Sequence, residues 1–536
     1  MPTTLRPGEK GLCLTAPTPL DELRTQLQHE PLPLTDDLFA WPLLTLDDDA
    51  LTHNIRLMAE LAAERAVWHA PHIKTPMSPQ IWARQKAAGA WAATVATPGQ
   101  LRTAYAWGVK RLLLANELVD PREIAWLLTA LQQDDELDVW LQVDSVAGVD
   151  LLRPLADQPR LHVLVEVGVP SVHQDWPDHQ GGPDHKDVPG PQGAPAHRGV
   201  LGRTGVRTTN EALRLAQVVV DAGLTLGGVT GYEGPAATTA APDDLKAVAD
   251  WCDQLAEVAR TVKPLRPTAE TSQTAQTSQT AETRPTEQTS QTEQPFIVSA
   301  GGSAFLDVVL DRLAPPNHQS TDGRPDWQLV VRSGAYVTSD DDHYAVLDPW
   351  LRLGKPPLRP AITVWAQVLS TPEPGLALLG AGRRDVPSDL GLPVPKWFRR
   401  AAGPASVTPT SVPPAAVTPT SAGPTAVPPA SATPASAGPA FVSPTSVTPT
   451  SVSPTAVSPA APDLGPRLPL EDAAIAALND QHAFLVGPGA SQLRPGDVVG
   501  LGISHPCTAL DRWRVAALTR EDNGETMATD LYTFDF

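Results

Sequence analysis

Eight short apolar segments recur between residues 66 and 333, and their recurrence is the feature that most restricts how this chain can fold. Each segment is rich in aliphatic or β-branched side chains, which is typical of strands buried on both faces of a parallel sheet. The segments cover residues 66–73, 91–96, 110–116, 138–143, 161–169, 226–232, 296–300 and 328–333. We therefore expect eight buried strands in this part of the chain.

The stretches between these segments are predicted to be helices. One begins near Asp48, where Leu51, Ile55 and Met58 fall on a single face at the spacing of an amphipathic helix. The others are expected at 78–89, 98–107, 121–132, 208–223, 241–262 and 304–313. Strands that alternate with helices predict an α/β fold with a parallel (β/α)8 barrel of the TIM type. The alternative, an open doubly wound sheet, usually has a GxGxxG turn after its first strand, and none follows 66–73.

The pattern changes after the eighth segment. From residue 345 onward the strand-like stretches are shorter, and they lie at 361–370, 376–381, 482–486, 497–503 and 513–518. This pattern predicts a C-terminal all-β domain. We expect three parts: an N-terminal segment, 1–40, that packs on the β domain, the barrel over 41–343, and the β domain over 344–536.

Three low-complexity segments look foreign to a compact fold and account for much of the high count of 58 prolines. Residues 401–462 contain no charged residue and carry proline about every fifth position, which predicts a disordered tether that interrupts the β domain. Residues 264–295 repeat TSQT, and residues 172–198 combine four histidines with Gly, Pro and Asp. We interpret both as solvated insertions in the barrel, and we favour solvated histidines over a metal site in 172–198.

Charge and hydropathy exclude several kinds of partner. The 60 acidic residues against 40 Lys and Arg give a net charge of −20, which disfavours nucleic acids and anionic membranes. No run of 18 apolar residues exists, so no transmembrane helix is expected. The first residues, MPTTLRPGEK, lack the apolar core of a secretion signal, and the three cysteines show no CxxC spacing. We therefore expect a soluble cytoplasmic protein.

The residues that follow the predicted strands suggest the chemistry, because catalytic groups of such barrels lie at the C-terminal strand ends. Lys74 follows the first strand, where partial desolvation would lower its pKa and suit it to form a Schiff base. The alternative is a lysine whose amine reaches bulk solvent. Gly301, Gly302 and Ser303 follow the seventh strand and open a helix, so their amides could hold a phosphate. A lysine and a phosphate cradle together indicate a pyridoxal phosphate site.

Longer motifs carry a family resemblance. They include His72-x-Lys74-Thr75-x-Met77, Asn116-Glu117, Gly202-Arg203-x-Gly205-Val206, Gly231-Tyr232-Glu233-Gly234, Gly301-Gly302-Ser303, Arg332-Ser333-Gly334-x-Tyr336 and His505-Pro506-Cys507. In this order they resemble the amino acid deaminase branch of the D-threonine aldolase/D-serine dehydratase family, across most of residues 40–520 outside the insertions. The resemblance implies a fold-type III pyridoxal phosphate enzyme with an alanine racemase-like barrel, which acts as a homodimer.

The resemblance also implies roles for individual residues. Lys74 would bind the cofactor covalently, Arg203 would face its pyridine nitrogen, and Tyr232 would contact its ring. Gly301, Gly302 and Ser303 would bind its phosphate. His72 would pack near the ring, although a structural role for this histidine is an equal alternative.

The motif His505-Pro506-Cys507 is a candidate metal site. A proline between the two residues predicts an extended backbone, on which side chains two positions apart share a face. Imidazole and thiolate suit Zn²⁺, and two protein ligands leave positions open for water and substrate. The motif alone is weak evidence, and the resemblance is what assigns a metal to it. We expect Zn²⁺, with Mn²⁺ as the alternative.

These observations predict a pyridoxal phosphate- and zinc-dependent lyase. It would eliminate water from D-serine or D-threonine and release a 2-oxo acid and ammonia, with Lys74 as the base for the Cα proton. Alternatives are a D-threonine aldolase that yields glycine and acetaldehyde, and a non-catalytic pyridoxal phosphate-binding homeostasis protein. Such homeostasis proteins lack a second domain and a metal pair. A racemase would need a second base, for which Tyr336 is the candidate.

Overall fold

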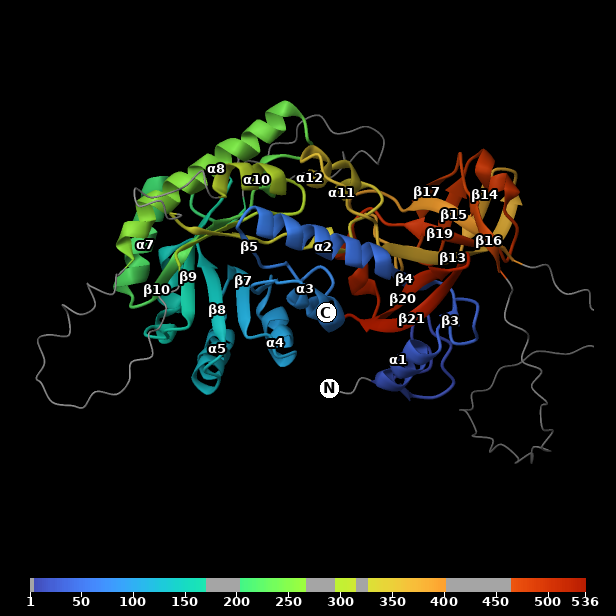
Figure 1. Ribbon diagram of the computed structural model, residues 1–536, viewed down its shortest axis with the longest axis horizontal. Coiled ribbons are helices and arrows are strands. Elements are labelled where there is room, and N and C mark those ends of the chain that lie inside the picture. Colours follow the sequence, from blue (N-terminus) through green and yellow to red (C-terminus); the bar gives the residue numbers. More distant parts are fainter. Residues whose placement is uncertain (1–3, 170–202, 267–294, 315–325, 402–463) are drawn as a thin grey trace, which may run out of the picture. The chain divides into compact units, whose positions relative to one another are not determined.

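The computed structural model describes residues 4–169, 203–266, 295–314, 326–401 and 464–536 (Figure 1). The predictions for 172–198, for most of 264–295 and for 402–462 therefore lie outside the described residues. Among the helices that are described, none combines the length and the hydropathy that crossing a membrane requires.

All eight predicted barrel strands are present and parallel. In the sheet they follow the order β5-β12-β11-β10-β9-β8-β7-β6. Their bounds are β5 (Trp68–His69), β6 (Ala93–Val95), β7 (Arg111–Glu117), β8 (Asp138–Val143), β9 (Leu161–Val167), β10 (Thr225–Gly231), β11 (Ile297–Ala300) and β12 (Gln328–Val331). Backbone hydrogen bonds join the residues after β5 to β6, from Trp91 N to His69 O at 2.7 Å and from Thr94 N to Pro71 O at 2.9 Å. The sheet thereby closes into the expected barrel.

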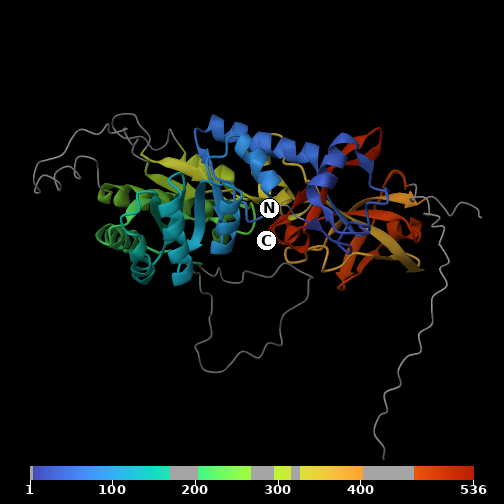
Figure 2. The same ribbon diagram turned by 90° about the horizontal axis from the view of Figure 1, so that it is seen from below.

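Helices follow the strands and pack on their outer face, as α7 and α8 do in Figure 2. They are α2 (Asp48–Glu64), α3 (Pro79–Ala87), α4 (Pro98–Ala106), α5 (Pro121–Gln133), α7 (Thr209–Asp221), α8 (Pro242–Val262) and α10 (Leu306–Leu313), each within a few residues of its prediction. A short helix, α6 (Val146–Leu151), was not predicted. Several begin at a side-chain cap, for example Ser78 before α3 and Thr208 before α7, which satisfies free amides of the first turn.

Eleven of the other described strands form a second sheet, which is mostly antiparallel. Its main path is β16-β15-β19-β13-β4-β20-β21-β3, and β14, β17 and β18 branch from β13. The bounds are β3 (Leu32–Pro33), β4 (Leu43–Asp47), β13 (Ile362–Glu373), β14 (Leu376–Leu379), β15 (Val394–Ala401), β16 (Leu464–Pro469), β17 (Ala474–Leu478), β18 (Ala483–Val486), β19 (Val498–Gly502), β20 (Val515–Asp522) and β21 (Glu525–Thr533). The all-β C-terminal region is as predicted.

One strand of this sheet comes from a part of the chain that the sequence places in the barrel. β4 pairs antiparallel with β13 and parallel with β20, so it belongs to the β region. The boundary expected at residue 41 therefore falls after β4, where α2 begins. β4 is buried, but a local hydrophobic pattern does not reveal a partner more than 300 residues away.

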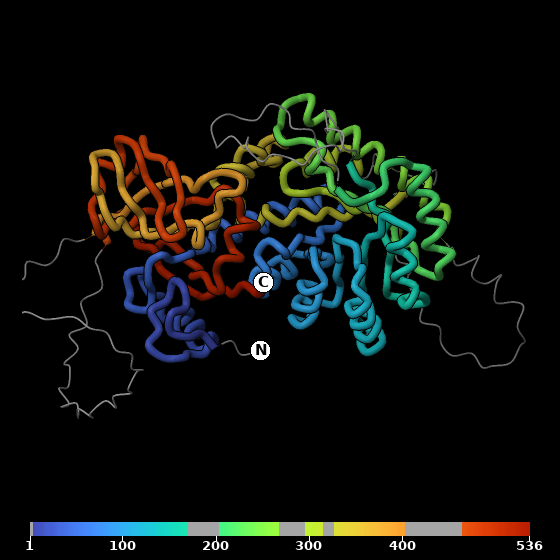
Figure 3. The backbone as a smooth tube through the Cα atoms, turned by 180° about the vertical axis from the view of Figure 1, so that it is seen from behind, coloured from blue at the N-terminus to red at the C-terminus, as the bar shows by residue number. Residues whose placement is uncertain are grey.

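The N-terminal residues also lie against the C-terminal strands (Figure 3). The short β1 (Thr4–Leu5) and β2 (Thr18–Pro19) pair with each other and precede α1 (Leu20–His29). The Arg24 guanidinium of α1 bonds the Asp530 carboxylate of β21 at 2.8 Å. Two short helices, α11 (His343–Val346) and α12 (Pro349–Arg352), connect the barrel to β13.

Aromatic rings fill the barrel interior near the N-terminal ends of the strands. Trp68 stacks on Trp91 at 4.7 Å, Trp91 lies 4.8 Å from Trp140, and Trp140 stacks on His162 at 4.4 Å. Small and aliphatic side chains from the strands pack around these rings. These rings occupy the interior at this end of the barrel, whereas the ligand sites of such barrels lie at the opposite end, where the strands terminate.

Candidate functional site

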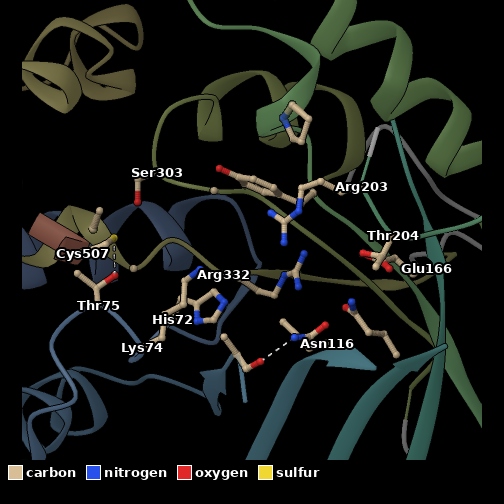
Figure 4. Close-up of a pocket in the computed structure, with 18 of the residues that line it drawn as sticks. His72, Lys74, Thr75, Asn116, Glu166, Arg203, Thr204, Ser303, Arg332 and Cys507 are labelled. Carbon is tan, nitrogen blue, oxygen red and sulfur yellow. Dashed lines mark hydrogen bonds between the residues drawn. The ribbon is translucent and has the colours of Figure 1, made fainter. Parts of the chain in front are cut away.

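A cavity of about 300 Å³ lies where the barrel strands end. Its lining includes all but one of the predicted site residues: His72, Lys74, Arg203, Tyr232, Gly302, Ser303, His505 and Cys507. Only Gly301 does not line it. Figure 4 shows His72, Arg203 and Arg332 around the centre of the cavity, Thr75 and Cys507 on one side, and Glu166 and Thr204 on the other. The structure thus brings strand ends and the His-x-Cys segment into one site.

Lys74 is partly buried in the wall of this cavity, just after β5. Burial lowers the pKa of its amine because it penalises the charged form. The Cys507 thiolate opposes this shift, and the guanidinium groups of Arg203 and Arg332 add to it. An amine with a lowered pKa is unprotonated more often at neutral pH, as a nucleophile or a base must be.

His72 lies beside Lys74, and the backbone of Gly334 packs closely against it. A Cβ at Gly334 would come within 2.5 Å of the His72 carbonyl oxygen, so only glycine fits there. Burial, then Lys74 and Arg332, hold the His72 pKa well below its usual value. Its Nδ1 is buried without a hydrogen-bond partner. His72 is therefore a neutral ring with one nitrogen available inside the site.

Arg203 and Tyr232 also line the cavity and lie close to each other. The Arg203 guanidinium carbon is 5.7 Å from the centre of the Tyr232 ring. Burial raises the pKa of the Tyr232 hydroxyl to about 12, and the neighbouring Glu233 adds to the effect. Tyr232 therefore stays a neutral hydrogen-bond donor, and it lines the cavity with 41% of the residue exposed.

The amides of the predicted phosphate-binding loop already donate hydrogen bonds to a side chain of the protein. The Gly301 amide donates to Glu233 Oε2 at 3.2 Å, and the Gly302 amide donates to Glu233 Oε1. Glu233 is fully buried, and burial raises its pKa above the usual range. Glu233 directly follows Tyr232 at the end of β10, the strand that pairs with β11, which explains why its carboxyl group reaches these amides. Sequence reasoning assigned no role to Glu233.

The His-x-Cys segment reaches the cavity by a different backbone path from the one predicted. His505 is extended, with φ −153° and ψ 108°, but Pro506–Thr508 form a 3-10 turn. The expectation of an extended segment with both side chains on one face is therefore wrong for Cys507. The turn nevertheless places both residues in the cavity wall. The Cys507 Sγ lies 3.2 Å from the Thr75 hydroxyl, which links it to the residue next to Lys74.

Three carboxyl groups to which sequence reasoning gave no role meet at the ends of three successive strands. Oxygen atoms of Glu117, Asp144 and Glu166 lie within 4.8 Å of one another, and Glu166 lines the cavity. Burial raises the pKa of Glu117 to about 8, and Glu166 contributes to the shift. Their position at strand ends was the available signal, the same one that identified Lys74.

Tyr336, the candidate second base of a racemase, lies outside this site. Its side chain is 1% exposed, and its hydroxyl accepts a hydrogen bond from Gln85 Nε2 at 2.9 Å. It lines a separate cavity of about 220 Å³ together with Trp68 and Trp91. The tyrosine that does line the main cavity, besides Tyr232, is Tyr344. A racemase is therefore no longer supported by Tyr336.

Comparison with known proteins agrees with this arrangement. Residues 361–519 match the family described as "Putative serine dehydratase domain". Over 226 residues, 41% of this chain, the sequence is 27% identical to D-threo-3-hydroxyaspartate dehydratase of Delftia sp. (strain HT23), and the match spans about half of that relative's length, 51%. Both matches support the resemblance to the D-threonine aldolase/D-serine dehydratase-like family.

Solved structures related to this family share the fold over almost the whole chain. D-threonine aldolase from Filomicrobium marinum is similar with a TM-score of 0.58 at 18% identity, covering 94% of this chain and 97% of that one. D-threo-3-hydroxyaspartate dehydratase from Delftia sp. HT23 has a TM-score of 0.54 at 17% identity, with coverages of 91% and 97%. An alanine racemase-like protein from Idiomarina loihiensis has 0.53 at 14%, with 92% and 96%. The barrel and the β region are thus those of an alanine racemase-like fold.

Proposed function

We propose that this chain is a pyridoxal phosphate-dependent lyase that eliminates water from D-amino acids with a β-hydroxyl group, such as D-serine or D-threonine. The products would be a 2-oxo acid and ammonia. The observation that carries the proposal is that one cavity is lined by a lysine of lowered pKa, an arginine, a neutral tyrosine and a histidine–cysteine pair. The names of the relatives, a D-threonine aldolase and a dehydratase of D-threo-3-hydroxyaspartate, support the class of substrate.

The cavity fits a cofactor of this kind. Within the described residues, His72 Nδ1, Glu166 Oε2 and Arg332 Nε are buried at or beside it without a partner, and such atoms usually meet a polar ligand or water. The cations Lys74, Arg203 and Arg332 suit a phosphorylated anion. Its volume is at the lower end of the range for small-molecule sites.

Each predicted residue has a place in this assignment. Lys74 would bind pyridoxal phosphate covalently, Arg203 would face the ring nitrogen, and His72 and Tyr232 would contact the ring. The loop of Gly301, Gly302 and Ser303 would hold the phosphate once the amides of Gly301 and Gly302 release the Glu233 carboxyl group. When bound, the cofactor supplies an electron sink that makes the substrate's Cα proton acidic.

The chain's own residues would then carry out two tasks. Lys74, whose pKa is lowered by burial, would take the Cα proton. The Arg203 guanidinium has N–H donors and no acceptor, so it can only donate a hydrogen bond to the ring nitrogen. The cofactor would therefore withdraw less charge than it does beside a carboxylate, and departure of the β-hydroxyl would depend on help at the β-carbon.

His505 and Cys507 would supply that help by holding Zn²⁺. Their imidazole and thiolate are ligands that Zn²⁺ prefers, and both line the cavity. A Zn²⁺ ion stabilises negative charge on a leaving oxygen. One of the solved relatives, a cysteine-to-alanine mutant of D-threo-3-hydroxyaspartate dehydratase, is in the metal-free form, which supports a metal role for a cysteine in such enzymes.

Products from a panel of substrates test the proposal. The purified chain would be incubated with D-serine, D-threonine, D-threo-3-hydroxyaspartate and L-serine, with and without a chelator. We expect ammonia and a 2-oxo acid from D-substrates, none from L-serine, and loss of activity on chelation that Zn²⁺ restores better than Mn²⁺. Glycine from D-threonine, formed much faster than any 2-oxo acid, would instead establish an aldolase.

The thiolate is our reason for favouring dehydration over aldol cleavage. In dehydration the metal must stabilise a departing hydroxide, which favours a tightly held Zn²⁺, and the Cys507 thiolate is a strong ligand for it. In aldol cleavage the oxygen stays on the aldehyde and must lose its proton to a base. We further propose that the active form is a homodimer, which size-exclusion chromatography with light scattering would test.

A further inference from the structure

A carboxylate that the proposed mechanism does not use contacts His505 directly. Asp389 Oδ2 lies 2.5 Å from His505 Nδ1, in the loop between β14 and β15. The other oxygen, Oδ1, accepts a hydrogen bond from the Thr508 hydroxyl at 2.7 Å. The Thr508 hydroxyl is also 3.4 Å from His505 Nδ1. Asp389 and Thr508 thus approach the imidazole at one and the same nitrogen.

The loop that carries Asp389 is anchored to the His505 segment close to both residues. The Ser504 hydroxyl donates to the Gly391 carbonyl oxygen at 2.6 Å. Gly391 has φ +146°, and a Cβ there would come within 2.6 Å of Asp342 Oδ2, so glycine is required at this contact. On the other side of Asp389, the Trp513 indole N–H donates to the Asp385 carbonyl oxygen at 3.0 Å. The loop is therefore held on both sides of Asp389.

This geometry selects one tautomer of His505. A carboxylate can only accept a hydrogen bond, so Nδ1 of the imidazole must carry the proton that the contact requires. In the neutral ring this leaves the lone pair on Nε2, the other nitrogen of a residue that lines the cavity. A metal ion needs that lone pair, and metal-binding histidines commonly donate their second N–H to a carboxylate.

We propose that Asp389, itself held by Thr508, is a positioning residue that fixes His505 with Nε2 available to Zn²⁺. This inference rests on the proposed function, because it assumes that His505 and Cys507 hold the metal. The competing interpretation is an ordinary surface ion pair, since 45% of the Asp389 side chain is exposed. An ion pair of that kind contributes about 0–1 kcal/mol to stability and would leave zinc affinity unchanged.

Zinc affinity of the full-length chain separates the two interpretations. Apoprotein of the wild type, Asp389→Ala and Asp389→Asn would be titrated with Zn²⁺ against a chromophoric chelator. We expect Asp389→Ala to raise the Kd for zinc by about 10- to 100-fold, the usual effect of losing such a partner. Asp389→Asn keeps an acceptor oxygen but loses the charge, so its Kd should lie between the two.

Asp511→Asn is the matched control. Asp511 has the same exposed fraction, 45%, in the same segment of the chain, and its carboxylate pairs with Arg512. The control should therefore bind zinc within about twofold of the wild type, which shows that loss of one negative charge nearby is not sufficient. The apoproteins of the variants and of the wild type should have the same circular dichroism spectrum and melting temperature. A change in the Kd for zinc then reports a change at the metal site and not a loss of fold.

The outcomes distinguish this inference from the proposed function. Tight zinc binding by the wild type together with an unchanged Kd in Asp389→Ala would overturn the positioning role alone. A wild type that takes up no zinc would overturn both the metal site and the positioning role. Equal weakening in Asp389→Ala and Asp511→Asn would show a general charge effect and would also overturn the inference.

Discussion

The two ends of the barrel are built on opposite principles. At the N-terminal end of the strands, Trp68, Trp91, Trp140 and His162 stack at 4.4–4.8 Å and fill the interior. At the C-terminal end the interior opens into the cavity, where Lys74 and other charged groups are desolvated. Packing of the rings therefore stabilises the fold at one end, whereas desolvation of charged groups at the other end costs stability and prepares those groups for chemistry. Substitutions at the two ends should separate these effects.

The largest effect is expected at the open end. Lys74→Ala removes both the amine that would bind the cofactor and the base for the Cα proton. We expect activity to fall by at least about a thousandfold and the visible absorbance of bound pyridoxal phosphate to disappear. The melting temperature should hardly change, because the amine is desolvated there and makes no core contact. Absorption spectra and ammonia release measure both effects.

An exposed lysine provides the control for this substitution. Lys86 is exposed on α3, a short distance further along the chain, and Lys86→Ala should leave spectrum and activity unchanged. If Lys74→Ala retained cofactor that borohydride could reduce, another lysine would have to bind it and the assignment would be wrong.

The next largest effect is a loss of stability at the N-terminal end of the barrel, where aromatic rings fill the interior. Trp140 is 1% exposed and lies between Trp91 and His162, so Trp140→Ala leaves a cavity that rigid strands cannot close. We expect the free energy of unfolding to fall by about 3–5 kcal/mol, while the protein that remains folded keeps most of its turnover. Urea denaturation monitored by circular dichroism measures the loss.

Trp126 offers a comparison outside the barrel interior. It is half-buried on α5, where the Arg102 guanidinium lies 4.9 Å from its ring. Trp126→Ala should cost about 1 kcal/mol. Equal losses for the two tryptophans would contradict the view that the aromatic stack supports the barrel.

A smaller loss of activity should distinguish the proposed metal ligands from the cofactor-binding lysine. Cys507→Ala removes one proposed zinc ligand but no cofactor contact. We expect zinc content to fall and activity to drop by about a hundredfold, equivalent to about 2.7 kcal/mol, while the cofactor spectrum persists. Cys13, which is exposed and far along the chain, gives the control Cys13→Ala. Unchanged zinc content in Cys507→Ala would remove the cysteine from the metal site.

Sequence reasoning succeeded where a feature is local to the chain. The alternating apolar segments predicted all eight barrel strands, and the strand ends pointed to Lys74, which lines the cavity. It missed features that depend on distant partners. β4 joins β13 across more than 300 residues, Glu233 reaches the amides of the Gly301–Ser303 loop, and Asp389 reaches His505.

Tyr336 shows that a local pattern can also suggest a role that tertiary contacts rule out. Its place after the eighth strand suggested a catalytic base, because strand ends of such barrels usually face the site. Packing instead turns the side chain toward Gln85, which contributes a hydrogen bond of 2.9 Å. A strand end predicts which residues are near the mouth, but the direction of each side chain depends on contacts that no local pattern encodes.

The smallest expected effect concerns the pH dependence of stability, and it tests whether the cavity end of the barrel shifts the pKa of Glu117. Burial, together with Glu166, raises the pKa of Glu117 from an ordinary value of 4.5 to about 8. Between these two values the folded protein keeps a proton that the unfolded chain releases. Because the unfolded state then binds fewer protons, stability falls as pH rises from about 4.5 to 8 and levels off above that range.

Glu117→Gln removes this dependence, because the amide is neutral in both states and has nearly the shape of the protonated acid. The melting temperature of the variant should therefore match the wild type near pH 5 and exceed it by a few degrees near pH 9. Glu136→Gln, at a carboxylate that is 75% exposed, should show no such divergence. A difference between Glu117→Gln and the wild type that stays constant from pH 5 to pH 9 would mean that the pKa of Glu117 is not raised in the folded protein.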